Sequence, residues 1–120
     1  MYLRNGIAKS ELSQTGALAI GIPGALAAYN LAINKYGNLD FAKLLRQAAM
    51  IADEGFLLDD SYLVRLKKVV NKLRLFPASS RIFLDSNGSP WPKGYRLKQS
   101  DLAKSYRNIA NHSVDWFYIF

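Results

Sequence analysis

The sequence predicts an all-α fold: a mainly helical chain of about four or five short helices, preceded by an irregular N-terminal arm. Two observations lead to this prediction. Apolar residues recur at every third or fourth position in several segments, which is the spacing of an amphipathic helix. Asp or Ser stands before these segments and Gly or Pro stands after them, as helix caps and stops do. The same observations define the predicted elements, taken below in chain order.

Composition limits what the chain can be. It has 120 residues, 16 Lys+Arg and 9 Asp+Glu, giving a formal charge of +7. Because 50% of the residues are hydrophobic, intrinsic disorder is excluded. The length fits one domain, and we interpret residues 1–15 as an irregular arm and residues 16–120 as a single helical domain. With no cysteine, the chain has no disulfide, Cys-based zinc site or thiol nucleophile.

The first half of the sequence predicts an arm, a short segment that leads into the first helix, and two helices. Asn5-Gly6 is a turn signal in the arm. Residues 17–22 form either a short strand or an extended lead, which Pro23 stops. A helix over residues 25–36 follows, and Gly37 ends it as a left-handed C′ residue. The next helix covers residues 41–54, with Asp40 as its N-cap and Gly55 as its stop.

The second half predicts two or three more helices. Asp59 or Asp60 caps a third helix, whose apolar period is the clearest in the chain and which Pro77 ends. Residues 78–84 form a short fourth helix, and residues 85–94 form a loop by composition. Ser100 caps the last helix. The end of the chain, at residues 114–120, is too rich in aromatic residues for a solvated tail.

The residues that could carry chemistry are few. His112 lies at a predicted helix end with no acidic neighbour, where a histidine more often interacts with the last carbonyls than acts as a base. Asp53-Glu54 and Asp59-Asp60 are pairs of adjacent residues, which do not share a helix face. Capping or exposed charge explains both pairs. We therefore predict no catalytic, cofactor-binding or metal-binding residue in this chain, and no cofactor.

Two features could bind an anion. The turn at residues 21–24 opens a helix whose first amides can hold an anion, but it lacks the Gly-Lys-Ser/Thr ending of a phosphate loop. The third helix carries cations on its polar face, namely Arg65, Lys67, Lys68, Lys72 and Arg74. Tyr62 lies on the apolar side and is not interleaved with them, as a base-stacking platform requires. A basic helical module that binds nucleic acid or an acidic protein is therefore the alternative function.

No membrane contact is expected. No segment reaches the ~18 consecutive apolar residues of a membrane span. The longest weakly polar run, residues 16–29, is interrupted by Pro23 and three glycines. Residues 1–6 show no apolar core of a signal peptide, so the sequence leaves the compartment open.

Four phrases stand in a fixed order along the chain. They are residues 15–24 (TGALAIGIPG), 35–39 (KYGNL), 48–56 (AAMIADEGF) and 92–106 (PKGYRLKQSDLAKSY), which continues through Ile109-Ala110 to Phe117-Tyr118. Each phrase alone is weakly specific. Together, in this order and spacing, they resemble the large subunit of gamma-glutamyltranspeptidase over essentially the whole chain.

The resemblance implies a parent enzyme of the N-terminal-nucleophile hydrolase class, which cleaves itself into two subunits. The freed N-terminal threonine of the small subunit attacks the gamma-glutamyl amide of glutathione-type substrates. Its own α-amine activates the hydroxyl, so cleavage must precede catalysis. The glutamyl group then passes to water or to an amino acid or peptide. Members of the family are mostly periplasmic or extracellular.

The family's functional residues do not map onto this chain. Arg4 does not match the family's substrate-binding arginine, which the resemblance places upstream. Ser79-Ser80 is not the family's serine pair, which, like the catalytic threonine, the resemblance places after Phe120. Ser113 and Phe120 stand where the family pattern usually has Gly, so the last turn is expected to depart from that pattern.

The prediction is therefore a helical scaffold segment of a gamma-glutamyltranspeptidase-like enzyme, inactive as an isolated chain. Its partners would be the large-subunit core and the small subunit of the parent enzyme. Apolar area left bare on this segment would favour self-association. The surfaces expected to associate are the Ala-rich first helix and the aromatic C-terminus.

Overall fold

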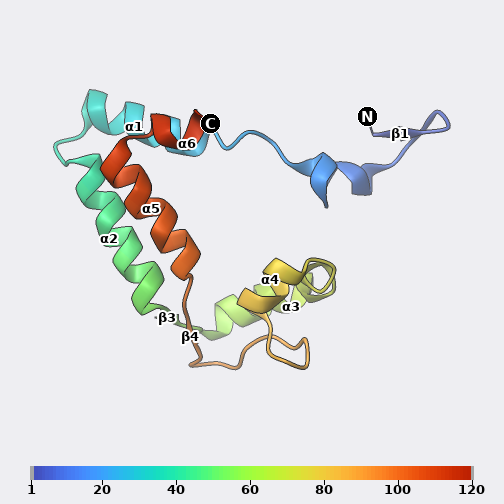
Figure 1. The fold of residues 1–120 in the computed structure, drawn as a ribbon. Helices are drawn as coiled ribbons and strands as arrows, with labels where there is room; N and C mark the ends of the chain where they lie inside the picture. Colours follow the sequence, from blue (N-terminus) through green and yellow to red (C-terminus); the bar gives the residue numbers. More distant parts are fainter. Residues whose placement is uncertain (1, 120) are drawn as a thin grey trace.

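The structure, a computed structural model, describes residues 2–119 and confirms the mainly helical fold. Figure 1 shows two groups of helices joined by a narrow ribbon, with an N-terminal arm that projects away from both. The larger group holds α1 (Ala25–Tyr36), α2 (Phe41–Glu54), α5 (Ser100–His112) and α6 (Asp115–Tyr118). The smaller group holds α3 (Asp60–Leu73) and α4 (Pro77–Phe83).

The α2–α5 pair is the best-packed part of the molecule, and Figure 1 shows the two helices side by side. Ala49 of α2 and Ala103 of α5 are both 0% exposed, because small side chains let the two backbones approach closely. The main core cluster comprises Leu45, Ile109 and Val114. Partly buried side chains from α1, α2, α5 and α6 pack against that cluster: Leu26, Phe41, Tyr106, Ala110 and Phe117.

The predicted caps of α2 and α3 are confirmed. The Asp40 carboxylate accepts a hydrogen bond from the Ala42 amide at 3.0 Å. Gly55 ends α2 with φ +78°, a conformation that L side chains rarely adopt. At α3 the structure decides between the two candidate aspartates, because the Asp59 carboxylate accepts a hydrogen bond from the Tyr62 amide at 2.7 Å.

The prediction that Pro77 ends α3 is wrong. The helix ends at Leu73, and Pro77 is the first residue of α4. A helix has no partner for its first amides, so proline's missing N–H costs nothing there. The Ser80 hydroxyl donates a hydrogen bond to the Leu73 carbonyl at 3.0 Å and satisfies the end of α3. The short fourth helix itself is confirmed, and so is the loop that follows it.

Two other expectations about helix ends are also wrong. Gly37 follows the last residue of α1 as expected, but its φ of −92° makes it extended and not left-handed. A Cβ there would lie 2.8 Å from the Ile33 carbonyl oxygen, so a side chain would require the end of α1 to shift. Ser100 is the first residue of α5, and Gln99 occupies the N-cap position. The Gln99 amide donates to the Ala52 carbonyl at 2.8 Å, which fixes the start of α5 beside the end of α2.

Before α1, the chain has little regular structure. Residues 17–22 do not form the strand, and only part of this range is the expected extended segment: Ala17–Ala19 is a 3-10 turn, η2, and extended backbone begins at Ile20. The arm also contains a hairpin that the sequence did not predict, β1 (Leu3–Arg4) and β2 (Ile7–Ala8), and a 3-10 turn, η1 (Ser10–Ser13). The predicted Asn5-Gly6 turn connects the two strands, and both of its residues have positive φ.

A short ribbon joins the two helix groups, and the sequence did not predict it. β3 (Phe56–Leu57) pairs antiparallel with β4 (Arg96–Leu97), with Phe56 opposite Leu97. The chain leaves α2 through β3, builds α3 and α4, and returns through β4 to α5 (Figure 1). Gly55 lies against this ribbon, because a Cβ there would be 2.6 Å from the Leu97 carbonyl oxygen.

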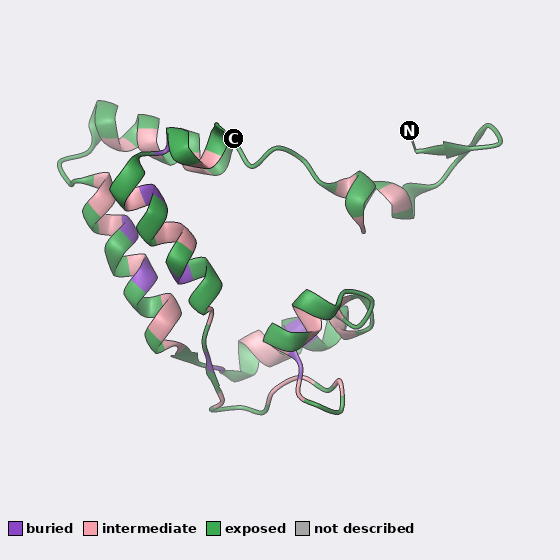
Figure 2. Cartoon of the chain, viewed as in Figure 1, coloured by how far each residue is buried: buried purple, intermediate pink, exposed green. Residues whose placement is uncertain are grey.

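The molecule is more open than its length requires. Its radius of gyration is 17.6 Å, against roughly 13–14 Å for a compact domain of this length. Its accessible surface is 9008 Å², about 2,500 Å² more than a compact protein of this mass exposes. Figure 2 shows buried residues as scattered patches on the helices, the ribbon and the segments that connect them. No helix within residues 2–119 has the length and hydropathy to cross a bilayer.

Candidate functional site

An apolar hollow lies between α1 and the α2–α5 pair. Its volume is about 480 Å³, and its walls are mostly aliphatic and aromatic side chains, including Leu26, Tyr29, Phe41, Leu44, Leu102 and Tyr106. It forms because α1 has no buried residue and does not pack tightly on the pair. The hollow offers an apolar surface, and its lining residues include no Asp, Glu, Lys, Arg or His.

A second hollow of about 480 Å³ lies at the end of the same helices and is more polar. Asn30 and Asn34 of α1 line one side, while Asp40, Ser113 and Asp115 line the other. The two asparagines hydrogen-bond one another at 3.3 Å, and Asp40 caps α2. The Ser113 hydroxyl accepts from the Asp115 amide at 3.3 Å. The Ser113 hydroxyl and the Asp40 carboxylate are therefore engaged in local backbone contacts.

The turn at residues 21–24 is held by a residue whose role the sequence reasoning missed. The Tyr118 hydroxyl donates a hydrogen bond to the Pro23 carbonyl and accepts one from the Ala27 amide at 3.2 Å. An amide in the first turn of α1 is thus already occupied. The dense aromatic cluster at the end of the chain was the available signal, but its partner was not readable from sequence spacing.

His112 lies at the exposed C-terminal end of α5. Its ring centroid is 6.4 Å from that of Trp116. Among residues 2–119, no hydrogen bond or ion pair recorded in the structure involves its side chain. Within the described residues, no hydrogen bond links this ring to a nucleophile or to an orienting carboxylate.

Asp53 joins the two packed helices. It forms an ion pair with Arg107 of α5. The Arg107 guanidinium, as a hydrogen-bond donor, lowers the pKa of the Asp53 carboxyl below its ordinary value of 3.8, although desolvation opposes that effect. The Ser100 hydroxyl contributes a smaller lowering. Glu54 beside it is exposed, so the adjacent acids do not act together.

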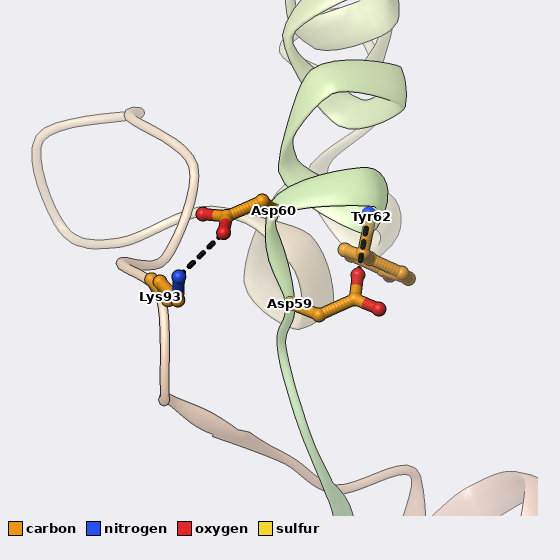
Figure 3. A network of polar contacts seen from close by, with 4 residues as sticks. All are labelled: Asp59, Asp60, Tyr62 and Lys93. Carbon is orange, nitrogen blue, oxygen red and sulfur yellow. Dashed lines mark hydrogen bonds and ion pairs between the residues drawn. The ribbon is translucent and has the colours of Figure 1, made fainter.

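The second acidic pair is also divided between two roles, as Figure 3 shows. Asp59 caps α3, and Asp60 points the other way to form an ion pair with Lys93 of the long loop. Across residues 2–119, no group of three or more His, Cys, Asp or Glu side chains is placed to hold a metal ion. Each acidic pair has a structural role of the kind that capping and charge pairing predict.

The cations of α3 remain at the surface. Arg65, Lys67, Lys68 and Lys72 are exposed. Arg74 is engaged, because its Nε donates to the Gly88 carbonyl at 2.8 Å and its guanidinium also donates to Asn71. Tyr62 is partly buried and packs edge-on against Phe56, with ring centroids 5.8 Å apart. The base-stacking aromatic that a single-stranded nucleic-acid site requires is therefore not on this face.

Comparison with known proteins identifies the family. Residues 1–119 match the gamma-glutamyltranspeptidase family. The chain is 35% identical over 109 residues to the glutathione hydrolase proenzyme of Escherichia coli (strain K12), a match that covers 91% of this chain and 19% of that protein. The chain therefore belongs to the gamma-glutamyltranspeptidase family.

Solved structures agree with this assignment. The chain superposes on the gamma-glutamyltranspeptidase of Helicobacter pylori with a TM-score of 0.91 and 27% identity, over 98% of this chain and 34% of that one. It also superposes on the Bacillus anthracis transpeptidase CapD with a TM-score of 0.73 and 34% identity, over 84% of this chain and 35% of that one. Because the first match covers nearly all residues, the projecting arm belongs to the shared shape.

The matches cover only part of each relative. The chain spans about a fifth of the length of the curated relatives, 19% of the Escherichia coli protein and 21% of its Pseudomonas counterpart. Those relatives are proenzymes, in which this region is part of a larger chain. In those relatives, the segment that this chain matches is accompanied by the rest of a larger protein, which agrees with the open shape described above.

Proposed function

We propose that this chain is a helical scaffold segment of a gamma-glutamyltranspeptidase-type enzyme, in which residues 16–120 act as one helical unit. The reaction of that enzyme would be gamma-glutamyl transfer or hydrolysis of glutathione-type substrates. The groups that carry out the reaction would come from other parts of the enzyme. On its own, this chain should not turn over gamma-glutamyl amides.

The accessible surface is the observation that carries this proposal. An excess of about 2,500 Å² over a compact protein exceeds the roughly 800 Å² that each partner contributes to a standard interface. Much of the exposed surface is apolar: Ile20 and Ile22 of the lead are 77% and 90% exposed, and Tyr36 of α1 is 77% exposed. Such side chains favour a scaffold that other polypeptide covers.

The partners follow from the same surface. We infer that the large-subunit core and the small subunit of the parent enzyme cover the exposed faces of the arm and α1. Without them, two copies of this chain should associate through α1 or the aromatic C-terminal residues. Sedimentation at increasing concentration would then show a shift from monomer to dimer, and a monomer at every concentration would contradict this association.

The purified chain can be tested with gamma-glutamyl-p-nitroanilide, which releases a coloured amine when the gamma-glutamyl bond is cleaved. We expect no release above the rate without protein, because the chain presents no activated nucleophile among its described residues. The Escherichia coli glutathione hydrolase is a suitable positive control. Turnover that co-purifies with the chain and is lost on its denaturation would contradict the scaffold role.

A further inference from the structure

The positive charge of the chain is concentrated in the smaller helix group. Residues 61–84, which cover most of α3 and all of α4, contain no Asp or Glu and six cations: Arg65, Lys67, Lys68, Lys72, Arg74 and Arg81. The full chain has 16 cations and 9 acids, so the rest is almost neutral, with ten cations and nine acids. Most of the net positive charge of the chain therefore lies within residues 61–84.

Three of these cations share one side of α3. Arg65, Lys68 and Lys72 are spaced by three and four residues, which places their Cβ atoms above one another on a helix. All three are exposed. Leu66, which is 7% exposed, lies on a different side of α3, and that side is buried. We name the side formed by Arg65, Lys68 and Lys72 the α3 cationic face.

The charges on this face are not compensated within the described part of the chain. Like charges at these spacings destabilise a helix, and solvated protein surfaces usually mix both signs. The three ion pairs recorded for residues 2–119 join Lys93 to Asp60, Lys104 to Asp101, and Arg107 to Asp53, none of them on the cationic face. An anionic partner would remove this repulsion.

The cationic face differs from the surfaces assigned above to the enzyme core. The arm and α1 expose apolar side chains, which an apolar core can cover. Burying cations against such a core without carboxylates would be costly. The α3 cationic face must therefore stay in water or meet an acidic surface.

Neighbouring aliphatic side chains favour a polypeptide over a nucleic acid as the occupant. Val64 is 58% exposed and lies four residues from Lys68, on the edge of the same face. Leu75, just beyond the end of α3, is 69% exposed. A phosphate backbone gains little from covering these side chains, whereas an acidic polypeptide with its own apolar residues can bury them. We propose that the α3 cationic face docks an acidic polypeptide that also carries aliphatic side chains.

A labelled peptide of Glu-Glu-Leu repeats, roughly 20 residues long, is a suitable probe for a helix face of this kind. Its binding to the full chain can be followed by fluorescence anisotropy at physiological salt. The variant R65Q/K68Q/K72Q should bind about tenfold more weakly or worse, because it removes the proposed contacts. The control variant K35Q/K43Q/K104Q loses the same net charge from exposed lysines outside α3 and should bind within about threefold of the parent chain.

Reversing the charges of the cationic face tests whether a loss of binding comes from misfolding instead of from lost contacts. The variant R65E/K68E/K72E should lose the Glu-Glu-Leu peptide and gain a Lys-Lys-Leu peptide of equal length, with an unchanged helical circular dichroism spectrum. Equal losses in the cationic-face and control variants would overturn the proposal, as would no binding of the acidic peptide. A DNA duplex that binds more tightly than the peptide, and does so through the cationic face, would assign the face to nucleic acid and overturn it too.

Discussion

Helices α1 and α2 are neighbours in sequence but differ in what they bury. Both show apolar residues at helical spacing, and both begin and end near residues that the sequence predicted. α2 buries Leu45 and Ala49 through its packing with α5. α1 buries no residue, and its Tyr29 and Leu31 are 62% and 66% exposed. The difference teaches that helical spacing predicts a helix, whereas burial requires a closely packed partner. Within this chain α2 has one in α5, and α1 makes only limited contacts.

The largest expected effect comes from the glycine at the end of the packed helix. Gly55→Ala should destabilise the chain by about 3 kcal/mol, because it combines a strained φ with a close contact. A Cβ would meet the Leu97 carbonyl oxygen of the opposite strand at 2.6 Å, at φ +78°. The matched change at the end of α1 is Gly37→Ala. It should cost about 1 kcal/mol, since its φ is ordinary and the poorly packed end can shift.

Urea unfolding followed by circular dichroism would measure both glycine variants. If Gly37→Ala proved as harmful as Gly55→Ala, the end of α1 would be held as firmly as that of α2. The contrast between the two helices would then be wrong.

A matched pair of leucine truncations probes the helices themselves. Leu45→Ala should cost about 2 kcal/mol, at the low end for a buried leucine, because open hollows already adjoin the side chain. Leu45 is 7% exposed and lines both hollows. Leu31→Ala should change stability by less than about 0.5 kcal/mol, as expected for an exposed position. Equal effects in urea unfolding would show that α1 is packed in solution.

The helix ends of the packed pair provide a stabilising prediction. Gly55 after α2 and Ser113 after α5 have nearly the same backbone angles, φ +78°, ψ 164° and φ +76°, ψ 171°. Glycine adopts this region readily and other residues pay for it. Ser113→Gly should therefore raise stability by about 1 kcal/mol. A fall in the urea midpoint would mean that the Ser113 hydroxyl's bond to the Asp115 amide outweighs the strain.

The smallest effect concerns pH. Arg107 holds the pKa of Asp53 below 3.8 in the folded chain, so this ion pair stabilises the α2–α5 pair above the unfolded pKa. That stabilisation is lost as the pH falls through the lower folded value. The parent chain should lose part of its stability below about pH 4, and Asp53→Asn should lose less. Asp101→Asn is the control, because the Asp101 side chain is 98% exposed; a control that flattened the pH profile equally would contradict the assignment.

Local signals predicted much of the fold. Asp40 and Asp59 cap their helices as expected, since a carboxylate placed before a helix reaches its own first amides without help from other parts of the chain. Pro77 and Gly37 were correctly recognised as special residues but were given the wrong reasons. Proline can stop one helix or start the next. Glycine can be needed for a positive φ or for a close approach between backbone atoms. Only the packing around each residue decides between these two roles.

The long-range features were not predictable. The β3–β4 ribbon, the bond from Tyr118 to Pro23 and the Asp53–Arg107 ion pair each join residues far apart in sequence. No periodicity or spacing encodes such pairings. The candidate acids were visible in the sequence, but their partners came from the fold, which gave every aspartate of the two acidic pairs a structural role.

The sequence by itself determined where most of the helices form, the caps of α2 and α3, and the family, because helix periodicity, capping and motif order are local properties of the chain. The tertiary structure alone decided which apolar stripes are buried, how the two helix groups are joined, and which charges pair across the fold. Burial and ion pairing depend on which segments meet in space, and the structure leaves the apolar side chains of α1 and of the arm exposed.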